Sequence, residues 1–225
     1  MAEAPLRPRD AATLIIVRHK SGRAEVLMGE RSAKHVFVPH NYVFPGGRVD
    51  RADGYVEPAE PLRADVLERL SASATPRRAK AIALAAVRET FEETGLILGR
   101  PREAGEITKV PKGWEHFFET GMVPVLGGLT YVARAVTPTG RPRRFNARFF
   151  VVDAELLQGR ERGNGELEEL RWFSLEEAAA LKIRPITKMV LAEIAARLEK
   201  GDLHDPERPV PAWRVFNGRR LVSYE

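Results

Sequence analysis

The stretch RETFEETG, residues 88–95, brings three glutamates together within five positions of a predicted helix. Like charges three or four residues apart repel on a helix surface, so this arrangement needs compensation. Arg88 can pair with Glu92 at i+4, and a divalent cation can bridge several carboxylates. Hard cations such as Mg²⁺ and Mn²⁺ prefer carboxylate oxygens as ligands. The alternative interpretation is a solvated acidic helix face that binds nothing.

The helix that carries this stretch is predicted over residues 75–96. Thr75 is typical of an N-cap and Pro76 of the first helical position, and Gly95 indicates the C-terminal end. At about 100° per residue, one side of this helix is apolar and is expected to pack on a sheet. That side consists of Leu84, Val87 and Phe91. The roughly opposite side carries Glu89, Glu92 and Glu93.

The segments before this helix are typical of strands followed by a loop and a short helix. The predicted elements are strands at 11–19 and 24–31, β-forming residues at 35–47, a loop at 50–61 and an amphipathic helix at 61–72. The two strands are expected to form a hairpin, because SGR between them is a turn signal. FPGG (44–47) is a glycine turn that lets the backbone approach a ligand. Leu62, Val66 and Leu70 share one side of the short helix.

The segments after the long helix alternate again between strands and helices. The predicted elements are a short helix or ordered loop at 111–121, strands within 126–138, 144–154 and 166–175, helices at 174–183 and 186–201, and a hairpin that turns at Asn217-Gly218. Ser174 and Glu177 have the spacing of a capping box, and Asn-Gly between apolar runs is a hairpin signal. This order predicts an α/β (α+β) fold, with helices packed on the faces of a mixed sheet.

Composition limits the class of protein. The chain has 225 residues, no cysteine and a net charge of +5. No apolar run approaches the roughly 18 residues of a membrane-spanning helix, so we expect a cytoplasmic protein without a membrane partner. The charge favours small anionic molecules, and nucleic acid is not expected, because the one basic cluster, residues 141–148, is local. That cluster is either a solvated loop or an anion-binding loop.

Together, FPGG and RETFEETG resemble the Nudix box, the motif of hydrolases that cleave a nucleoside diphosphate linked to another moiety. The family pattern is G-x5-E-x7-R-E-U-x-E-E-x-G-U, where U is a bulky apolar residue. Its second half matches at Arg88, Glu89, Glu92, Glu93, Gly95 and Leu96. The resemblance covers roughly residues 10–200. It implies a Nudix-type α/β/α sandwich with a mixed sheet, an inserted helix and extra C-terminal helices.

The box is interrupted by an insertion. Arg88 follows Gly47 by 41 positions where the pattern has 14, so about 27 residues are inserted, at little cost in loop-closure entropy. Asp53 stands where the pattern has Glu, and Thr90 where it has an apolar residue. A box split in this way is similar to a Nudix branch that includes coenzyme A diphosphatases of the mitochondrial and peroxisomal type and bacterial relatives. The expected organisation is a single domain over 1–225, with the insertion at about 51–76 and a C-terminal helix plus hairpin at about 186–225.

The resemblance implies roles for the matching residues. The implied ligands of Mg²⁺ or Mn²⁺ are Gly47, through its carbonyl, and Glu89, Glu92, Glu93 and Glu166. Glu89 resembles either a ligand or the base that activates water, and Arg88 resembles a residue that orients a glutamate. Glu166 is chosen from GELEEL (165–170) by the family's spacing to a Trp; its alternative is an edge strand with solvated charges.

The branch implies coenzyme A or an acyl-coenzyme A as the substrate. The alternatives are another nucleotide (a sugar nucleotide, a dinucleoside polyphosphate or a damaged nucleotide) and a Nudix-fold ligand sensor without catalysis. Arg offers a fork suited to phosphate, and the candidates for binding substrate are Arg31, Arg48, Arg144 and Arg148. Trp114 and Phe117 are expected to pack in the core rather than to stack on a base. The inserted helix is either a lid or packing, and the C-terminal hairpin packs on its own core or on a second copy in a homodimer.

Overall fold

A computed structural model describes residues 6–32, 40–106, 109–163, 165–216 and 218–225. The strands of the main sheet are β1 (Arg9–Lys20), β2 (Arg23–Arg31), β3 (Tyr42–Val43), β4 (Gly46–Arg48), β8 (Thr130–Val136), β9 (Phe145–Asp153), β11 (Leu167–Ser174), β12 (Pro211–Phe216) and β13 (Arg219–Tyr224). Two small sheets pair β5 (Leu96–Ile97) with β10 (Gln158–Gly159) and β6 (Gly99–Pro101) with β7 (Met122–Pro124). The helices are α1 (Ala64–Ser71), α2 (Pro76–Thr94), α3 (Glu115–Glu119), α4 (Leu175–Ala180) and α5 (Pro185–Lys200), with short 3-10 turns η1 (Ala52–Tyr55) and η2 (Ala154–Leu156).

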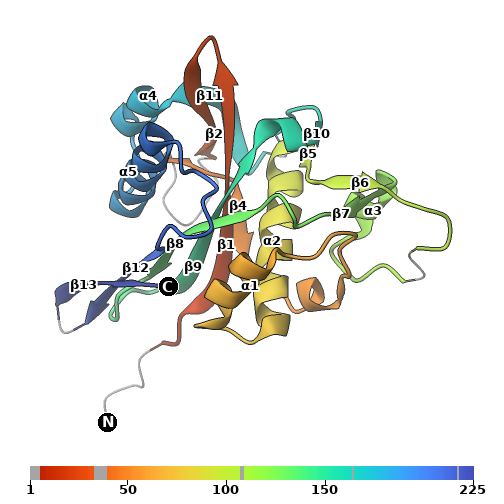
Figure 1. Cartoon of the computed structure of the whole chain (residues 1–225), viewed down its shortest axis with the longest axis horizontal. Coiled ribbons are helices and arrows are strands. Elements are labelled where there is room, and N and C mark those ends of the chain that lie inside the picture. The colour runs from red at the N-terminus through yellow and green to blue at the C-terminus, as the bar shows by residue number, and fades with distance from the viewer. Residues whose placement is uncertain (1–5, 33–39, 107–108, 164, 217) are drawn as a thin grey trace.

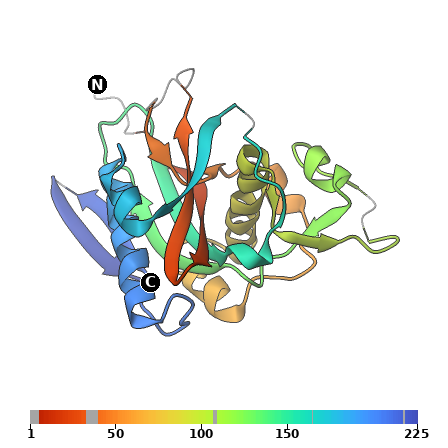
Figure 2. The ribbon, with the colours of Figure 1, turned by 90° about the horizontal axis from the view of Figure 1, so that it is seen from above.

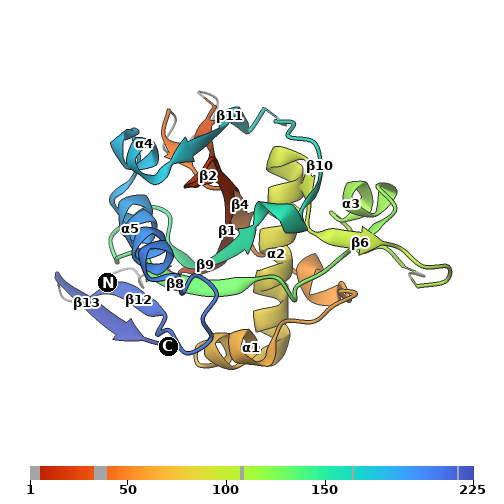
Figure 3. The same ribbon diagram turned by 45° about the horizontal axis from the view of Figure 1, so that its top comes forward.

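The main sheet is mixed and has nine strands (Figure 1). Its order is β11-β2-β1-β9-β8-β12-β13, with β3 paired to β2 and β4 paired to β1. β1 runs parallel to β9, and β8 runs parallel to β12, whereas the other neighbours are antiparallel. Helices α4 and α5 lie on one side of the sheet and α2 on the other (Figures 2 and 3). The predicted α/β/α arrangement is confirmed.

β1 separates two apolar cores. Leu14 and Ile16 belong to the core that contains α1 and α2, whereas Ile15 and Val17 belong to the core that contains α4 and α5. All four side chains are fully buried. Successive side chains of a strand point to opposite faces of the sheet, so a central strand covered on both sides is apolar at every position.

Most of the predicted elements form where the sequence indicates. β1 and β2 form the predicted hairpin, and Ser21 and Gly22 in its turn have positive φ values of 50° and 76°, as a tight two-residue turn requires. The capping box at the start of α4 is present, and Gly201 ends α5 in the left-handed conformation. β12 and β13 pair as the predicted C-terminal hairpin. Asn217 and part of the segment predicted at 35–47 lie outside the described residues.

The predicted ends of α2 are confirmed, and its predicted apolar side packs in the core, but the opposite side is not open to solvent. Glu93 is only 5% exposed and faces β4 of the sheet, and Phe91 is half-buried and packs on Phe117 of α3, with ring centroids 5.4 Å apart. The cause is that α2 is enclosed by β1, β4, η1 and α1 rather than lying on the surface. Its alanine-rich segment, residues 79–86, lets these elements approach closely, and the helix has almost no solvated side.

The inserted helix α1 packs on the core. Leu62, Val66 and Leu70 are buried, as their spacing predicts. Arg63, just before the helix, donates to the carbonyl oxygen of Leu129 at 3.3 Å. These contacts favour the packing role over the role of a lid. None of the helices in the described part of the chain is long and apolar enough to cross a membrane.

Candidate active site

A buried ion pair beside α2 organises the candidate site. Asp53 of η1 is fully buried and accepts hydrogen bonds from Arg88 Nε at 2.9 Å and Arg88 Nη2 at 3.2 Å. The same carboxylate accepts hydrogen bonds from Trp114 Nε1 at 3.0 Å and from the backbone N–H of Asp50 at 2.8 Å. These donors offset the cost of burying a charged carboxylate. The ion pair therefore fixes the Arg88 guanidinium relative to η1.

Arg88 in turn holds two of the three glutamates. Its Nη1 donates to Glu89 at 2.9 Å and to Glu92 at 3.3 Å, which is the predicted i,i+4 pair. Its Nη2 donates to the carbonyl oxygen of Arg48 at 3.1 Å, which ties α2 to the end of β4. The Arg48 side chain is itself 53% exposed and lies 3.8 Å from Asp50. Arg88 thus orients both carboxylates beside the glycine turn.

The two glycines of β4 bring the backbone directly against the glutamates. A Cβ atom added at Gly47 would lie 2.3 Å from Glu89 Oε2 and 2.4 Å from Glu89 Cδ. The N–H of Gly46 donates to Glu93 Oε2 at 2.8 Å. A Cβ atom at Gly46 would lie 2.4 Å from the carbonyl oxygen of Ala12 on β1. The close approach of strand and carboxylates therefore requires glycine at both positions.

Burial changes the proton affinity of the three glutamates. It raises the pKa of Glu93 to about 8, although the hydrogen bond from Gly46 acts in the opposite direction. It raises the pKa of Glu89 to about 7, against the lowering effect of the Arg88 charge. The pKa of Glu92 is also raised, first by burial. The main cause is the removal of the carboxylates from water, and the charges of neighbouring carboxylates add to it.

This donor set suits a hard divalent cation. Carboxylate oxygens are the ligands that Mg²⁺ and Mn²⁺ prefer, and a bound cation relieves the excess of negative charge. Within the described residues, no three acidic or histidine side chains already converge closely enough to hold an ion. Glu89 and Glu92 converge on Arg88 instead. A cation bound between them would replace part of their contact with Arg88.

Two further predicted residues approach the glutamates from neighbouring strands. Arg31 ends β2, and Glu166 precedes β11, where its carbonyl oxygen accepts the N–H of Ser32 at 3.1 Å. Burial is the main cause of the raised pKa of Glu93, the charge of Arg31 opposes it, and the charge of Glu166 adds to it. The charge of Glu166 also raises the pKa of Glu92. The fold thus brings both residues near the cluster, while their ligand roles stay predictions.

The two remaining arginines make contacts that hold the fold. Arg144 donates to the carbonyl oxygens of Thr137 and Leu6. Arg148 is fully buried on β9, and its Nη1 lies 2.5 Å from Asp10 Oδ1. A buried guanidinium with a carboxylate partner is a structural ion pair. The described contacts of both arginines are therefore with the scaffold and not with the glutamate cluster.

The sequence did not assign a role to Asp53 or Trp114. The signal for Asp53 was its position six residues after Gly47, where the motif has its first Glu. If the two halves of the motif had been aligned separately, Asp53 would have been assigned to the same site as Arg88. Trp114 is fully buried in the core as predicted, but its indole N–H also supports Asp53. That contact joins residues 61 positions apart and has no local signal.

The sequence matches a known protein family. A family model described as the NUDIX domain matches residues 75–194, more than half of the chain. This chain belongs to the Nudix family. The matched Nudix segment begins at the N-cap of α2, after the insertion that separates FPGG from RETFEETG.

Several Nudix relatives resemble the chain over most of its length. The acyl-coenzyme A diphosphatase NUDT19 of Gallus gallus is 27% identical over an alignment of 233 residues, gaps included. The alignment covers 76% of this chain and 62% of that protein. The putative nudix hydrolase 7 of Caenorhabditis elegans is 24% identical over 178 residues, which cover 75% of this chain and 52% of that protein. The match thus spans little more than half of these curated relatives. The crystal structure of a NUDIX hydrolase from Alicyclobacillus acidocaldarius is 26% identical, with a TM-score of 0.63 and coverage of 84% of this chain and 92% of that one.

Proposed function

We propose that this chain is a Mg²⁺- or Mn²⁺-dependent hydrolase that cleaves the diphosphate of a nucleotide linked to another moiety. The observation that carries the proposal is the set of three glutamates held between the Arg88 guanidinium and the glycine turn of β4. Membership of the Nudix family supports the class of reaction. The proposed substrate is coenzyme A or an acyl-coenzyme A, which the similarity to acyl-coenzyme A diphosphatase NUDT19 supports.

Each glutamate has a proposed part in this reaction. The proposed cation ligands are the carboxylates of Glu89, Glu92, Glu93 and Glu166 and the carbonyl oxygen of Gly47. When bound, a divalent cation neutralises charge on the phosphoryl oxygens and orients the diphosphate. Glu93 is anchored by the N–H of Gly46, and Glu92 by Arg88, so both carboxylates are held before any ligand enters.

Glu89 is proposed either as a further cation ligand or as the base that accepts a proton from the attacking water. Burial raises its pKa to about 7 in the metal-free protein, and a nearby cation would lower this value, so Glu89 would be an ionised carboxylate that can accept a proton at neutral pH. Arg88 positions the Glu89 carboxylate, and Asp53 fixes Arg88 in turn. Such support matters because a displacement of about 1 Å in a catalytic group lowers rates about 100-fold.

Two arginines are proposed to bind the diphosphate. Arg31 lies close enough to Glu93 for its charge to oppose the raised pKa that burial causes. Arg48 directly follows Gly47, and its guanidinium is half exposed. A guanidinium fork donates two parallel hydrogen bonds to phosphate oxygens.

The proposal is tested by measuring product release from a panel of nucleotides. The protein is stripped of metal with a chelator and assayed with and without Mg²⁺ or Mn²⁺ on coenzyme A, acyl-coenzyme A, a sugar nucleotide, a dinucleoside polyphosphate and an oxidised nucleotide. We expect hydrolysis only with the cation, with the highest kcat/KM on coenzyme A or its acyl derivative. A higher value on another nucleotide would overturn the substrate assignment but keep the reaction.

Single substitutions test whether turnover depends on the glutamate cluster or on acidic residues in general. Glu92→Gln and Glu93→Gln are expected to lower turnover by orders of magnitude. Glu199→Gln removes the same charge from an exposed position on α5, on the opposite side of the sheet, and is expected to keep the activity. No hydrolysis of any nucleotide by the parent protein, together with tight binding of one of them, would contradict the proposal and favour a ligand sensor.

A further inference from the structure

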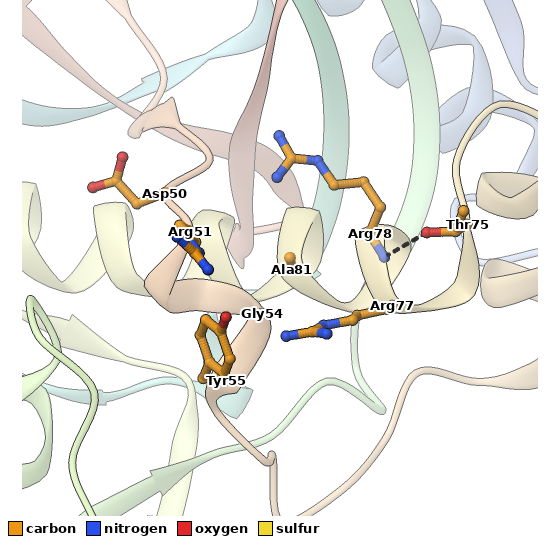
Figure 4. A pocket seen from close by; sticks show the side chains of 8 residues that line it. All are labelled: Asp50, Arg51, Gly54, Tyr55, Thr75, Arg77, Arg78 and Ala81. Carbon is orange, nitrogen blue, oxygen red and sulfur yellow. Dashed lines mark hydrogen bonds between the residues drawn. The ribbon is translucent and has the colours of Figure 1, made fainter.

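A pocket lined by several charged side chains lies beside the start of α2 (Figure 4). Its volume is about 450 Å³. Its charged side chains are those of Arg51, Arg77 and Arg78, with Asp50 as the one carboxylate among the lining residues. The inserted segment supplies one wall through η1, and the first turn of α2 supplies the other. The proposed reaction uses none of these side chains.

Two of the arginines converge on one tyrosine. The Arg77 guanidinium carbon lies 4.9 Å from the centre of the Tyr55 ring. The neighbouring guanidinium groups of Arg51 and, second, Arg77 lower the pKa of the Tyr55 hydroxyl. Figure 4 shows both side chains directed at Tyr55 from different elements. The Tyr55 side chain is exposed, so the three groups meet at the pocket surface. We call this set (Arg51, Tyr55 and Arg77) the arginine pair site.

The charge of the arginine pair site is not compensated by carboxylates. Among the described residues, neither Arg51 nor Arg77 has an ion pair with an Asp or Glu side chain. Arg78, in contrast, donates to Asp10 at 2.7 Å and points away from Tyr55 in Figure 4. Two guanidinium groups brought together repel each other unless an anion lies between them. The first turn of α2 adds to the same positive potential.

We propose that the arginine pair site binds a phosphomonoester. A guanidinium has five N–H donors in a planar fork, so Arg51 and Arg77 retain donors for a phosphate while they contact Tyr55. The Tyr55 ring contacts the Arg77 guanidinium, and its exposed surface offers a flat apolar area beside the phosphate. A dianionic phosphate supplies the negative charge that the described residues do not provide.

The two arginines of this site are set back from the glutamate cluster, although Asp50 of the same pocket lies 3.8 Å from Arg48. Arg77 precedes Glu89 by twelve residues on α2, which is about 18 Å at the rise of 1.5 Å per residue. The phosphate bound there belongs either to a second molecule or to a remote phosphate of the substrate. The second source rests on the proposed function, whereas the site itself does not. η1 links the two regions, because Tyr55 lies in the pocket while Asp53 of the same turn binds Arg88.

The binding test uses methyl phosphate, the smallest phosphomonoester, with chelator present so that no metal site contributes. Its dissociation constant is measured from the rise in the thermal midpoint at constant ionic strength. The Arg51→Gln/Arg77→Gln variant is expected to bind at least 100-fold more weakly, since each charge-assisted hydrogen bond accounts for about 10- to 100-fold. The matched control Arg219→Gln/Arg220→Gln removes two exposed positive charges from β13 and is expected to bind like the parent.

Equal binding by all three proteins, or no binding by the parent at tens of millimolar, would overturn the proposal. Circular dichroism melting of the ligand-free variants establishes that each is folded.

The source of the phosphate follows from the KM for coenzyme A relative to the KM for its 3′-dephospho form. Loss of a preference for coenzyme A in Arg51→Gln/Arg77→Gln identifies the substrate as the source. An unchanged ratio, with methyl phosphate still bound beside substrate, identifies a second molecule. Failure of all nucleotide hydrolysis would leave the binding result intact.

Discussion

Replacing Asp53 with Asn tests the ion pair that organises the site. The Asp53 carboxylate is fully buried and accepts four hydrogen bonds, two of them from Arg88. An Asn side chain keeps one acceptor oxygen and replaces the other with an N–H₂ group that faces donors. Arg88, with a side chain only 6% exposed, then loses its buried partner and keeps Glu89 and Glu92.

The structure gives the size of this effect. Breaking a buried ion pair on one side costs about 3–5 kcal/mol, and the two remaining carboxylates around Arg88 place Asp53→Asn near the lower end, at about 3 kcal/mol. In a chain of 225 residues this corresponds to a fall in Tm of about 6–12 °C. We also expect a lower kcat, because a freed guanidinium moves towards Glu89 and Glu92.

Urea unfolding followed by circular dichroism, in chelator at neutral pH, measures the change in the free energy of unfolding. Asp50→Asn is the control, because its side chain is 57% exposed and its contact with Arg48 is 3.8 Å long. Such a surface pair contributes less than about 1 kcal/mol. If Asp53→Asn were no less stable than Asp50→Asn, the central role of the buried pair would be refuted.

Three further results are expected. Gly47→Ala places a Cβ atom 2.3 Å from Glu89 Oε2, so kcat/KM should fall about 100-fold in steady-state assays while the far-ultraviolet spectrum is unchanged. In the metal-free protein, burial raises the pKa values of Glu89 and Glu93 from 4.5 to about 7 and about 8, so the native state holds more protons than the unfolded state. The free energy of unfolding should therefore fall by a few kcal/mol as pH rises from about 4.5 to 8. Urea titrations of Glu93→Gln should show a smaller dependence of this free energy on pH. Arg148→Gln removes one of the two arginines that pair with Asp10 and leaves Arg78 in place, so unfolding should require about 1.5–3 kcal/mol less while KM stays within about twofold. A raised KM with unchanged stability would favour Arg148 as a substrate ligand.

Local patterns were sufficient to predict much of the scaffold. Thr75, Pro76 and Gly95 determine the ends of α2 because capping depends on neighbouring residues alone. The spacing of RETFEETG similarly placed Glu89 and Glu92 beside Arg88, but it gave no sign of Asp53. The burial of Glu93 was not predictable from helical periodicity, since it depends on which elements enclose the helix.

Long-range partners explain the remaining differences. Arg148 lies in a basic cluster that suggested an anion-binding loop, but its partner Asp10 is 138 positions away and adjoins it only through the parallel pairing of β1 with β9. Asp53 and Arg88 are likewise 35 positions apart, with most of the insertion between them. Sequence spacing reveals which residues carry charge, whereas sheet topology decides which of those charges meet.

The location of a bound cation is the most direct test of the central claim. Crystals grown without metal and soaked in Mn²⁺ would give an anomalous difference map at the manganese absorption edge. We expect a peak within coordination distance of the Glu92 and Glu93 carboxylates, with at least one glutamate withdrawn from Arg88. Manganese bound only elsewhere on the molecule, with Glu89 and Glu92 still paired to Arg88, would contradict the account.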